Sequence, residues 1–191
     1  VYMVWSYGQA ANAGWLESLD QHFDNPDLFD KNWYDLDDIF SSARSFPIWN
    51  DGESYVMSIT AEAQTMFANQ NMLDAVGEGV PTTFDELLST GKKLKSGDVA
   101  GVAMRSKADG TAGSWPGGGF VFSNGGVIIQ DGKCMLDSPE AIEAIHYYGT
   151  ILKEAGPLGV GNYHWYECLN DYMQEVLDGF DVYSVLVNKD E

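Results

Sequence analysis

The chain has 191 residues, of which 45% are hydrophobic and 13% aromatic, so it can bury a core and is not a disordered segment. Its 29 Asp and Glu residues outnumber 10 Lys and Arg residues, giving a formal net charge of −19. That charge argues against binding to nucleic acids or anionic membranes, because both present negative phosphates. The sequence has no apolar run near the roughly 18 residues that suggest a membrane-spanning helix.

The N-terminal part is predicted to form a strand, a short helix and an acidic loop. Residues 1–5 are an apolar run that leads into a loop around Gly8, which is typical of a strand. Residues 10–19 follow as a short helix. Residues 20–38 are loop-like and acidic, with a cluster that comprises Asp24, Asp27, Asp30, Asp35, Asp37 and Asp38.

This acidic loop has two interpretations. Clustered carboxylates suit a hard cation such as calcium, but the spacing lacks an alternating D-x-D-x-D pattern and the glycine of the turn. We favour a solvated loop and keep a calcium-dependent adhesion or scaffold module as an alternative function.

The middle of the chain is predicted to contain three short elements. Residues 55–59 and 64–67 have the composition of strands, and residues 72–76 form a helical turn that ends at Gly77. Strands and helices also alternate in the sequence after Gly77.

A capping signal then predicts a longer helix. Thr83 and Glu86 have the spacing of a capping box, and the helix that they open is predicted to end near Gly97. Residues 99–104 follow as a strand. The glycine-rich residues 110–119 are too irregular for a regular element.

A tight turn and a long helix come next. Asp131 and Gly132 tolerate positive φ angles and lie between the apolar residues 127–129 and 134–136, which predicts a β-hairpin. Ser138 is predicted to cap a helix that ends at Gly156. The apolar face expected for that helix comprises Ala141, Ile142, Ile145, Tyr148, Ile151 and Leu152.

A final helix to about residue 177 and a strand over residues 182–187 complete the predicted order. Strands and helices alternate along the whole chain, which indicates the α/β class.

Several kinds of reaction lack a signal in the sequence. His22, His146 and His164 do not have the spacing of metal ligands, although His164 and Glu167 would share one helix face. The chain has no G-x-S-x-G elbow, P-loop or dinucleotide fingerprint. Neither cysteine has a neighbouring base that would make it a nucleophile. No cofactor or metal is therefore expected.

Aromatic and polar residues in loops point instead to a carbohydrate. A sugar has apolar C–H faces and a rim of hydroxyls, so its site needs flat rings together with carboxylates and amides. Tyr148 and Phe67 are more simply core residues, whereas Trp115 and Trp165 could be either core or ligand residues. The other candidates are Trp5, Tyr7, Gln9, Tyr163 and Glu167.

A series of motifs, in their order and spacing, carries a resemblance to a known family. They are Val4-Trp5-Ser6-Tyr7-Gly8-Gln9-Ala10, residues 55–62, Phe67-Ala68-Asn69, Pro81-Thr82-Thr83-Phe84-Asp85-Glu86-Leu87, Val99-Ala100-Gly101, Ser114-Trp115, Asn124-Gly125-Gly126, Ser138-Pro139-Glu140-Ala141 and Trp165-Tyr166-Glu167-Cys168. The chain resembles the family 1 extracellular solute-binding proteins, the sugar-binding subunits of bacterial ABC importers, and most of all the branch associated with sorbitol, mannitol and related polyols.

The resemblance implies a periplasmic-binding-protein-like (type II) α/β fold with two lobes and a ligand cleft between them. Residues 1–63 would be part of the first lobe, and residues 64–191 most of the second, with a hinge strand near 64–69. By similarity the ligand residues would be Trp5, Tyr7, Gln9 and Glu62 from the first lobe, and Trp115, Asn124, Tyr163, Trp165 and Glu167 from the second.

Three features depart from the family pattern. The hinge motif Phe-Tyr-Asn-Lys is here Phe67-Ala68-Asn69-Gln70, and Leu177-Asp178-Gly179-Phe180-Asp181 replaces the usual Gly-Lys-Ala-Ala-Met. Relatives also have further elements before and after this segment. We therefore expect an incomplete chain, or self-association through an unpaired sheet edge.

The resulting functional hypothesis is a periplasmic or extracellular protein, tethered by a lipid or not, that binds a sugar or polyol for an ABC permease and catalyses no reaction. A glycoside hydrolase is an alternative, because paired carboxylates among aromatics also suit that chemistry. In an oxidising compartment we further expect Cys134 and Cys168 to form a disulfide between the hairpin and the last helix.

Overall fold

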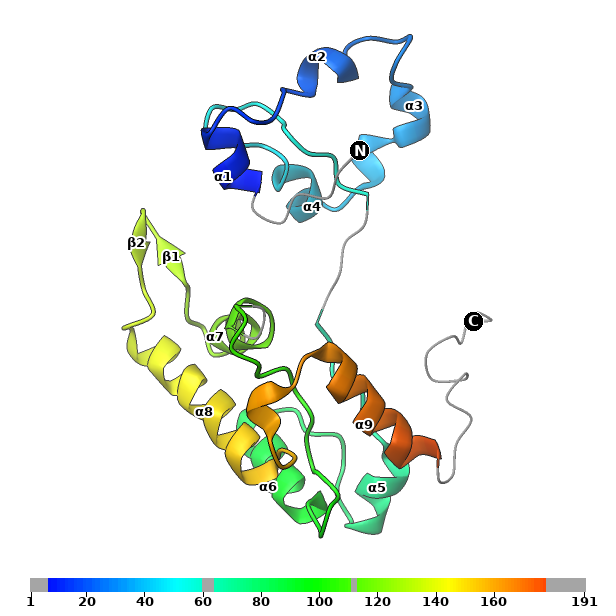
Figure 1. Cartoon of the computed structure of the whole chain (residues 1–191), viewed down its shortest axis with the longest axis vertical. Coiled ribbons are helices and arrows are strands. Elements are labelled where there is room, and N and C mark those ends of the chain that lie inside the picture. The colour runs from blue at the N-terminus through cyan, green and yellow to red at the C-terminus, as the bar shows by residue number, and fades with distance from the viewer. Residues whose placement is uncertain (1–6, 60–63, 111–112, 178–191) are drawn as a thin grey trace. The chain divides into compact units, whose positions relative to one another are not determined.

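The computed structural model describes residues 7–59, 64–110 and 113–177. The chain divides into two compact units, Val1–Ala63 and Gln64–Glu191, and each is described by itself (Figure 1).

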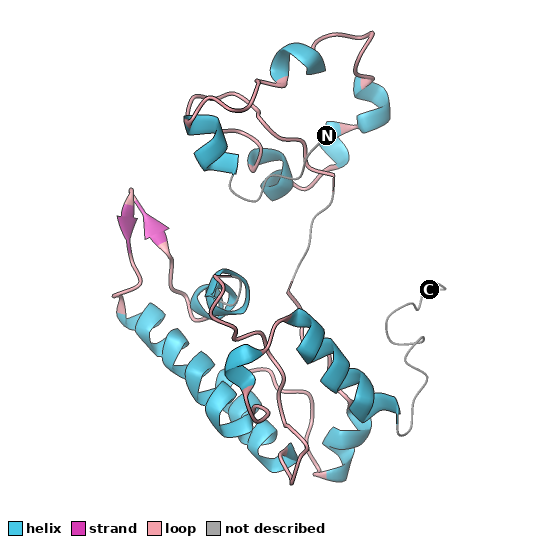
Figure 2. Ribbon diagram, viewed as in Figure 1, coloured by secondary structure: helices cyan, strands magenta, loops and turns pink. Residues whose placement is uncertain are grey.

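The first unit consists of short helical segments joined by loops (Figure 2). They are α1 (Tyr7–Asn12), α2 (Asp20–Phe23), α3 (Lys31–Tyr34), the 3-10 helix η1 (Leu36–Asp38) and α4 (Ser41–Ser45). The strand predicted over residues 1–5 lies outside the described residues.

Helix α1 ends sooner than the sequence predicted. Gly14 has a φ angle of 69°, and the N–H groups of Gly14 and Trp15 donate to the carbonyls of Ala11 and Ala10. This is the Schellman arrangement, which uses a left-handed glycine to close a helix. The helix predicted over residues 10–19 is therefore wrong in its bounds, because Gly14 stops it.

The acidic stretch is more structured than the predicted loop. The Asp30 carboxylate accepts hydrogen bonds from the N–H groups of Asn32 and Trp33 and so caps α3. Asp35 ends the same helix in a left-handed conformation, with a φ angle of 43°. Asp24 and Asp37 form ion pairs with Lys31 and Arg44.

The strand predicted over residues 55–59 does not form. A side chain hydrogen-bonds to the backbone there instead: the Tyr34 hydroxyl donates to the carbonyl of Ser58 at 2.8 Å. The Ser58 hydroxyl in turn donates to the carbonyl of Ala43 at 2.8 Å. These contacts connect Ser58 to α3 and α4, and residues 55–59 do not pair with another strand.

The second unit contains the longer helices. They are α5 (Gln70–Ala75), α6 (Phe84–Leu94), the π-helical turn η2 (Gly113–Gly117), α7 (Gly118–Ser123), α8 (Pro139–Ala155), the 3-10 helix η3 (Val160–Asn162) and α9 (Trp165–Leu177). The residues from 110 to 119, predicted to be irregular, thus include η2 and the start of α7 among those described.

The predicted caps of α6 and α8 are present. The Thr83 hydroxyl accepts from the N–H of Glu86, and the Ser138 hydroxyl accepts from the N–H of Ala141. The Glu86 carboxylate reaches the N–H and hydroxyl of Thr82 rather than Thr83, so the capping box is displaced by one residue on that side.

The predicted hairpin also forms. Strands β1 (Ile129–Gln130) and β2 (Lys133–Cys134) pair antiparallel, with Gln130 opposite Lys133. The turn residues Asp131 and Gly132 have φ angles of 52° and 73°, as a type I′ turn requires.

Helices α6 and α7 pack against α8 to make the core. Val121 of α7 and Ile151 of α8 are almost completely buried, and the rings of Phe84 and Phe120 stack with centroids 4.5 Å apart. The apolar face predicted for α8 is wrong at two positions, because Ile142 and Ile145 are 57% and 46% exposed. Only one side of α8 packs against α6 and α7. The smaller residues Ala144 and Ala155 are buried, whereas Ile142 and Ile145 lie outside that contact.

The predicted strands over residues 64–67 and 99–104 do not form either. The N–H groups of Gly101 and Val102 both donate to the carbonyl of Ala155, at 2.9 and 3.1 Å. The segment from residue 101 onward therefore uses backbone donors to hold the end of α8 instead of pairing with a strand.

Candidate functional site

The candidate residues from the sequence lie in both units. Tyr7 and Gln9 belong to the first unit, and the second holds Trp115, Asn124, Tyr163, Trp165 and Glu167. Trp5 and Glu62 lie outside the described residues, so the structure gives no place for them.

Tyr7 is part of an aromatic cluster in the first unit. Its hydroxyl donates to the carbonyl of Phe46 at 2.6 Å, and its ring meets the edges of Phe46 and Trp49. Gln9, on the same helix, is exposed. Tyr7 therefore has packing partners of its own, whereas Gln9 is accessible to a ligand.

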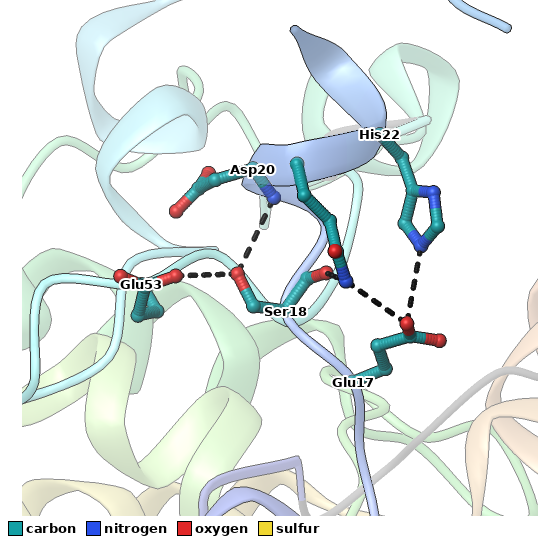
Figure 3. A network of polar contacts seen from close by, with 6 residues as sticks. Glu17, Ser18, Asp20, His22 and Glu53 are labelled. Carbon is teal, nitrogen blue, oxygen red and sulfur yellow. Dashed lines mark hydrogen bonds and ion pairs between the residues drawn. The ribbon is translucent and has the colours of Figure 1, made fainter. Parts of the chain in front are cut away.

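A polar network joins two loops of the first unit (Figure 3). The Ser18 hydroxyl donates to the Glu53 carboxylate, and the Asp20 carboxylate accepts from the N–H of Ser54 at 3.2 Å. His22 Nε2 lies 3.5 Å from Glu17 Oε1. These carboxylates connect loops, and among the described residues there is no group of three His, Cys, Asp or Glu placed to hold a metal ion.

The first turn of α9 is stabilised by its own glutamate. Glu167 Oε2 accepts from the backbone N–H of His164 at 2.9 Å, which is the returning half of a capping box. This hydrogen bond keeps the pKa of Glu167 below its ordinary value. Glu167 is therefore a carboxylate at neutral pH and accepts hydrogen bonds.

Tyr163 connects this turn to two other parts of the unit. Its hydroxyl donates to Asp171 Oδ2 at 2.6 Å, and that bond raises the pKa of Tyr163 to about 12. Its carbonyl accepts from the N–H groups of Ser106 and Lys107, at 2.9 and 3.0 Å. Tyr163 is thus held at both its side chain and its backbone.

These residues surround a hollow of about 290 Å³ lined by Tyr163, Tyr166, Glu167, Asn170 and Asp171. Two phenols, two carboxylates and one amide give it many hydrogen-bond acceptors beside flat rings. The sequence prediction missed Tyr166, Asn170 and Asp171. The signal for the last two was their spacing, three and four residues after Glu167 on a predicted helix.

Trp165 lies beside this hollow rather than in its lining. Its ring stacks on that of Tyr166, with centroids 3.6 Å apart and planes at 27°, and the residue is 38% exposed. Trp165 therefore supports a ring that does line the hollow and keeps an accessible surface of its own.

Trp115 occupies η2 and is half-buried. The guanidinium carbon of Arg105 lies 5.2 Å from the centroid of its ring, a cation–π contact. Part of this ring is thus already covered by a protein cation.

Asn124 has a structural role in this arrangement. Its Nδ2 donates to the carbonyl of Glu140 at 2.9 Å and to Glu143 Oε2 at 3.0 Å, which connects the end of α7 to α8. The structure does not bring it to the hollow near α9, since Asn124 is absent from its lining.

The disulfide expected between Cys134 and Cys168 is not formed, and both thiols are free. Cys134 is exposed on β2, whereas Cys168 is half-buried on α9, and Figure 1 shows these elements on opposite sides of the second unit. Burial raises the pKa of Cys168 to about 11.

No helix among the described residues is long and apolar enough to span a membrane.

The family model described as "Bacterial extracellular solute-binding protein" matches residues 1–179. A search of the curated proteins gives no match.

A solved structure is also similar: the crystal structure of an ABC transporter solute binding protein from Agrobacterium radiobacter K84 in complex with ribitol. It shares 24% sequence identity with a TM-score of 0.61, over 83% of this chain and 39% of that one. This likeness shows the fold, which is periplasmic-binding-protein-like as the sequence predicted, although the described part of this chain is mostly helical. The chain spans 39% of the length of that protein.

Proposed function

Because the chain belongs to the bacterial extracellular solute-binding protein family, we propose that it is the substrate-binding component of an ABC transporter and binds a sugar or polyol for import. The observation that carries this proposal is the hollow at the start of α9, whose lining matches a ligand rich in hydroxyl groups.

The hydrogen-bonding capacity of the lining explains the ligand class. One oxygen of Glu167 and one of Asp171 are used by protein donors, and each carboxylate has a second oxygen that can accept from a ligand hydroxyl. The Tyr166 ring, supported by Trp165, offers a flat surface to the C–H groups of a carbon chain. The ribitol in the similar solved structure supports an acyclic polyol, and we extend the proposal to sorbitol and mannitol.

The mechanism that we propose is closure of two lobes around the ligand. Residues 1–63 and 64–191 would belong to different lobes, and Trp5, Tyr7, Gln9 and Glu62 would contact the ligand from the first. A ligand that contacts both lobes favours the closed state by the difference in its affinity for the two states. A permease would then recognise that closed state.

The proposed location is periplasmic or extracellular, with or without a lipid anchor. The family description supports it, since these proteins are extracellular.

A glycoside hydrolase is the second candidate, and the hollow has two carboxylates. Such an enzyme needs one carboxyl group whose pKa is raised, so that it can act as a general acid near neutral pH. The pKa of Glu167 is lowered instead, by the hydrogen bond from the His164 N–H. We therefore favour binding without catalysis.

Calorimetric titration of the 191-residue chain tests the proposal. The ligands are ribitol, xylitol, sorbitol, mannitol and glucose, and a chromogenic glycoside tests for hydrolysis in parallel. We expect at least one polyol to bind and the glycoside to stay intact. Binding of none of the panel by a folded chain overturns the ligand class, and steady release of the chromophore favours the hydrolase.

A further inference from the structure

Arg105 lies on a segment that is held to the rest of the second unit by its backbone. Its carbonyl accepts a hydrogen bond from the Tyr148 hydroxyl on α8. The next two residues, Ser106 and Lys107, donate their N–H groups to the carbonyl of Tyr163. The backbone of Arg105 is therefore fixed relative to both α8 and the start of α9.

Its side chain has no polar partner in the described part of the chain. Arg105 is half-buried, and apart from the cation–π contact with Trp115 its guanidinium forms no hydrogen bond or ion pair with a described residue. A guanidinium has five N–H donors. This is unusual in a chain with 29 acidic side chains against 10 basic ones, where a carboxylate partner is readily available.

The segment that carries Arg105 is connected to the hollow near α9. The two residues that follow Arg105, Ser106 and Lys107, donate to the carbonyl of Tyr163, which lines the hollow together with Glu167. The charge of Arg105 also lowers the pKa of Cys168, the residue after Glu167, against the increase that burial causes. Arg105 is thus connected to Trp115 by its side chain, and its segment is connected to the lining of the hollow by backbone hydrogen bonds.

We propose that Arg105 is a specificity-determining residue of the ligand site, whose guanidinium donates hydrogen bonds to ligand oxygens while the Trp115 ring holds it in place. This inference rests on the proposed function and adds a donor to a site whose other polar groups are mainly acceptors. Because the guanidinium fork is planar, it matches two oxygens on neighbouring carbons, as in a vicinal diol. The substrate class that follows is a polyol or sugar with adjacent hydroxyls.

The same geometry changes the role of Trp115. The sequence suggested a platform on which the ligand carbons stack, but the guanidinium of Arg105 already lies over this ring. Trp115 would act as a positioning residue through Arg105. Loss of either residue should then remove the same contribution to binding, and loss of both should cost no more than loss of one.

The test is ribitol titration of five variants of the full chain by calorimetry. R105M removes the donors and keeps an apolar stem, R105K keeps the charge without the planar fork, W115A removes the ring, and the fourth variant combines R105M with W115A. K133M removes one positive charge from the exposed hairpin and is the matched control. Thermal unfolding of each ligand-free variant confirms that it is folded.

We expect R105M to bind ribitol at least tenfold more weakly, R105K to recover only part of that loss, and K133M to bind like the unchanged chain. The double variant should be no weaker than R105M alone. Three results would overturn the role of Arg105 and leave the proposed function standing. They are equal ribitol affinity of R105M and the unchanged chain, full recovery of affinity in R105K, and strictly additive losses of binding free energy in the double variant. If the unchanged chain binds none of the polyols, the proposed function fails and this inference fails with it.

Discussion

The hydroxyl of Tyr163 donates a hydrogen bond to Asp171 Oδ2 at 2.6 Å, across two turns of the chain at the start of α9. This bond orients two of the five residues that line the hollow, and it leaves the second oxygen of Asp171 for another donor. The relationship gives a prediction for both binding and alkaline titration.

Tyr163→Phe should weaken polyol binding, because Asp171 loses the donor that holds it in place. The pKa of Tyr163 is raised to about 12, above the ordinary value of 10.0. The stability that this bond adds is therefore complete below the unfolded pKa and is lost as the pH rises through about 12. Ultraviolet titration should show one fewer late-ionising tyrosine in the variant, and an unchanged titration curve would contradict the assignment.

Gly101→Ala should strongly destabilise the second unit. A Cβ built on Gly101 would lie 1.8 Å from the carbonyl oxygen of Gly91, a backbone atom that cannot move aside. The matched control is Gly149→Ala on the exposed side of α8, where a Cβ meets nothing within 4 Å. The control should be neutral or more stable by roughly 0.5–1 kcal/mol, because alanine favours a helix over glycine.

Thermal or urea unfolding of the two glycine variants measures the difference. We expect a cost of about 2 kcal/mol or more for Gly101→Ala, typical of steric overpacking in a core. Similar unfolding midpoints for the two variants would show that residues 91 and 101 do not approach as closely as described.

The two cysteines should be free and should differ in reactivity. Cys134 is exposed, whereas burial raises the pKa of Cys168 to about 11, so few Cys168 side chains are thiolates at pH 8. Iodoacetamide at that pH should modify Cys134 first, as peptide mass spectrometry can follow. Cys134→Ser serves as the control, since the remaining slow reaction must then come from Cys168. Isolation of a Cys134–Cys168 disulfide from folded protein would contradict the structure.

Asn124→Ala should reduce stability and leave ligand affinity unchanged. Its amide connects α7 to Glu140 and Glu143 on α8, and loss of such hydrogen bonds costs about 1 kcal/mol. Denaturant unfolding and polyol titration on the same preparation separate the two effects. A variant that unfolds normally but binds poorly would return Asn124 to the ligand site.

Local signals in the sequence were sufficient for the caps of α6 and α8 and for the hairpin of the second unit. Ser138 and Thr83 cap helices as predicted, and Asp131 with Gly132 makes the predicted hairpin, because a cap or a tight turn depends on a few consecutive residues. The order of motifs along the chain likewise predicted the family that the comparison identifies.

Strands and burial could not be predicted in this way. Residues 99–104 have the composition of a strand, yet Gly101 and Val102 donate to the end of α8, and whether a ladder forms depends on which partner the fold places alongside. The buried face of α8 was mispredicted at Ile142 and Ile145 for a similar reason, since periodicity shows that a helix is amphipathic but not which side its neighbours cover.

The candidate site shows the same division. Composition and motif order selected Tyr163, Trp165 and Glu167 as candidates, and the structure places Tyr163 and Glu167 in the lining of the hollow and Trp165 against Tyr166. Only the folded chain could show that Arg105 lies over Trp115, or that Asp171 accepts from Tyr163. These contacts depend on the direction of each side chain and on how the helices pack. Helix packing is decided by many residues that are distant in sequence, so no local pattern could predict the contacts.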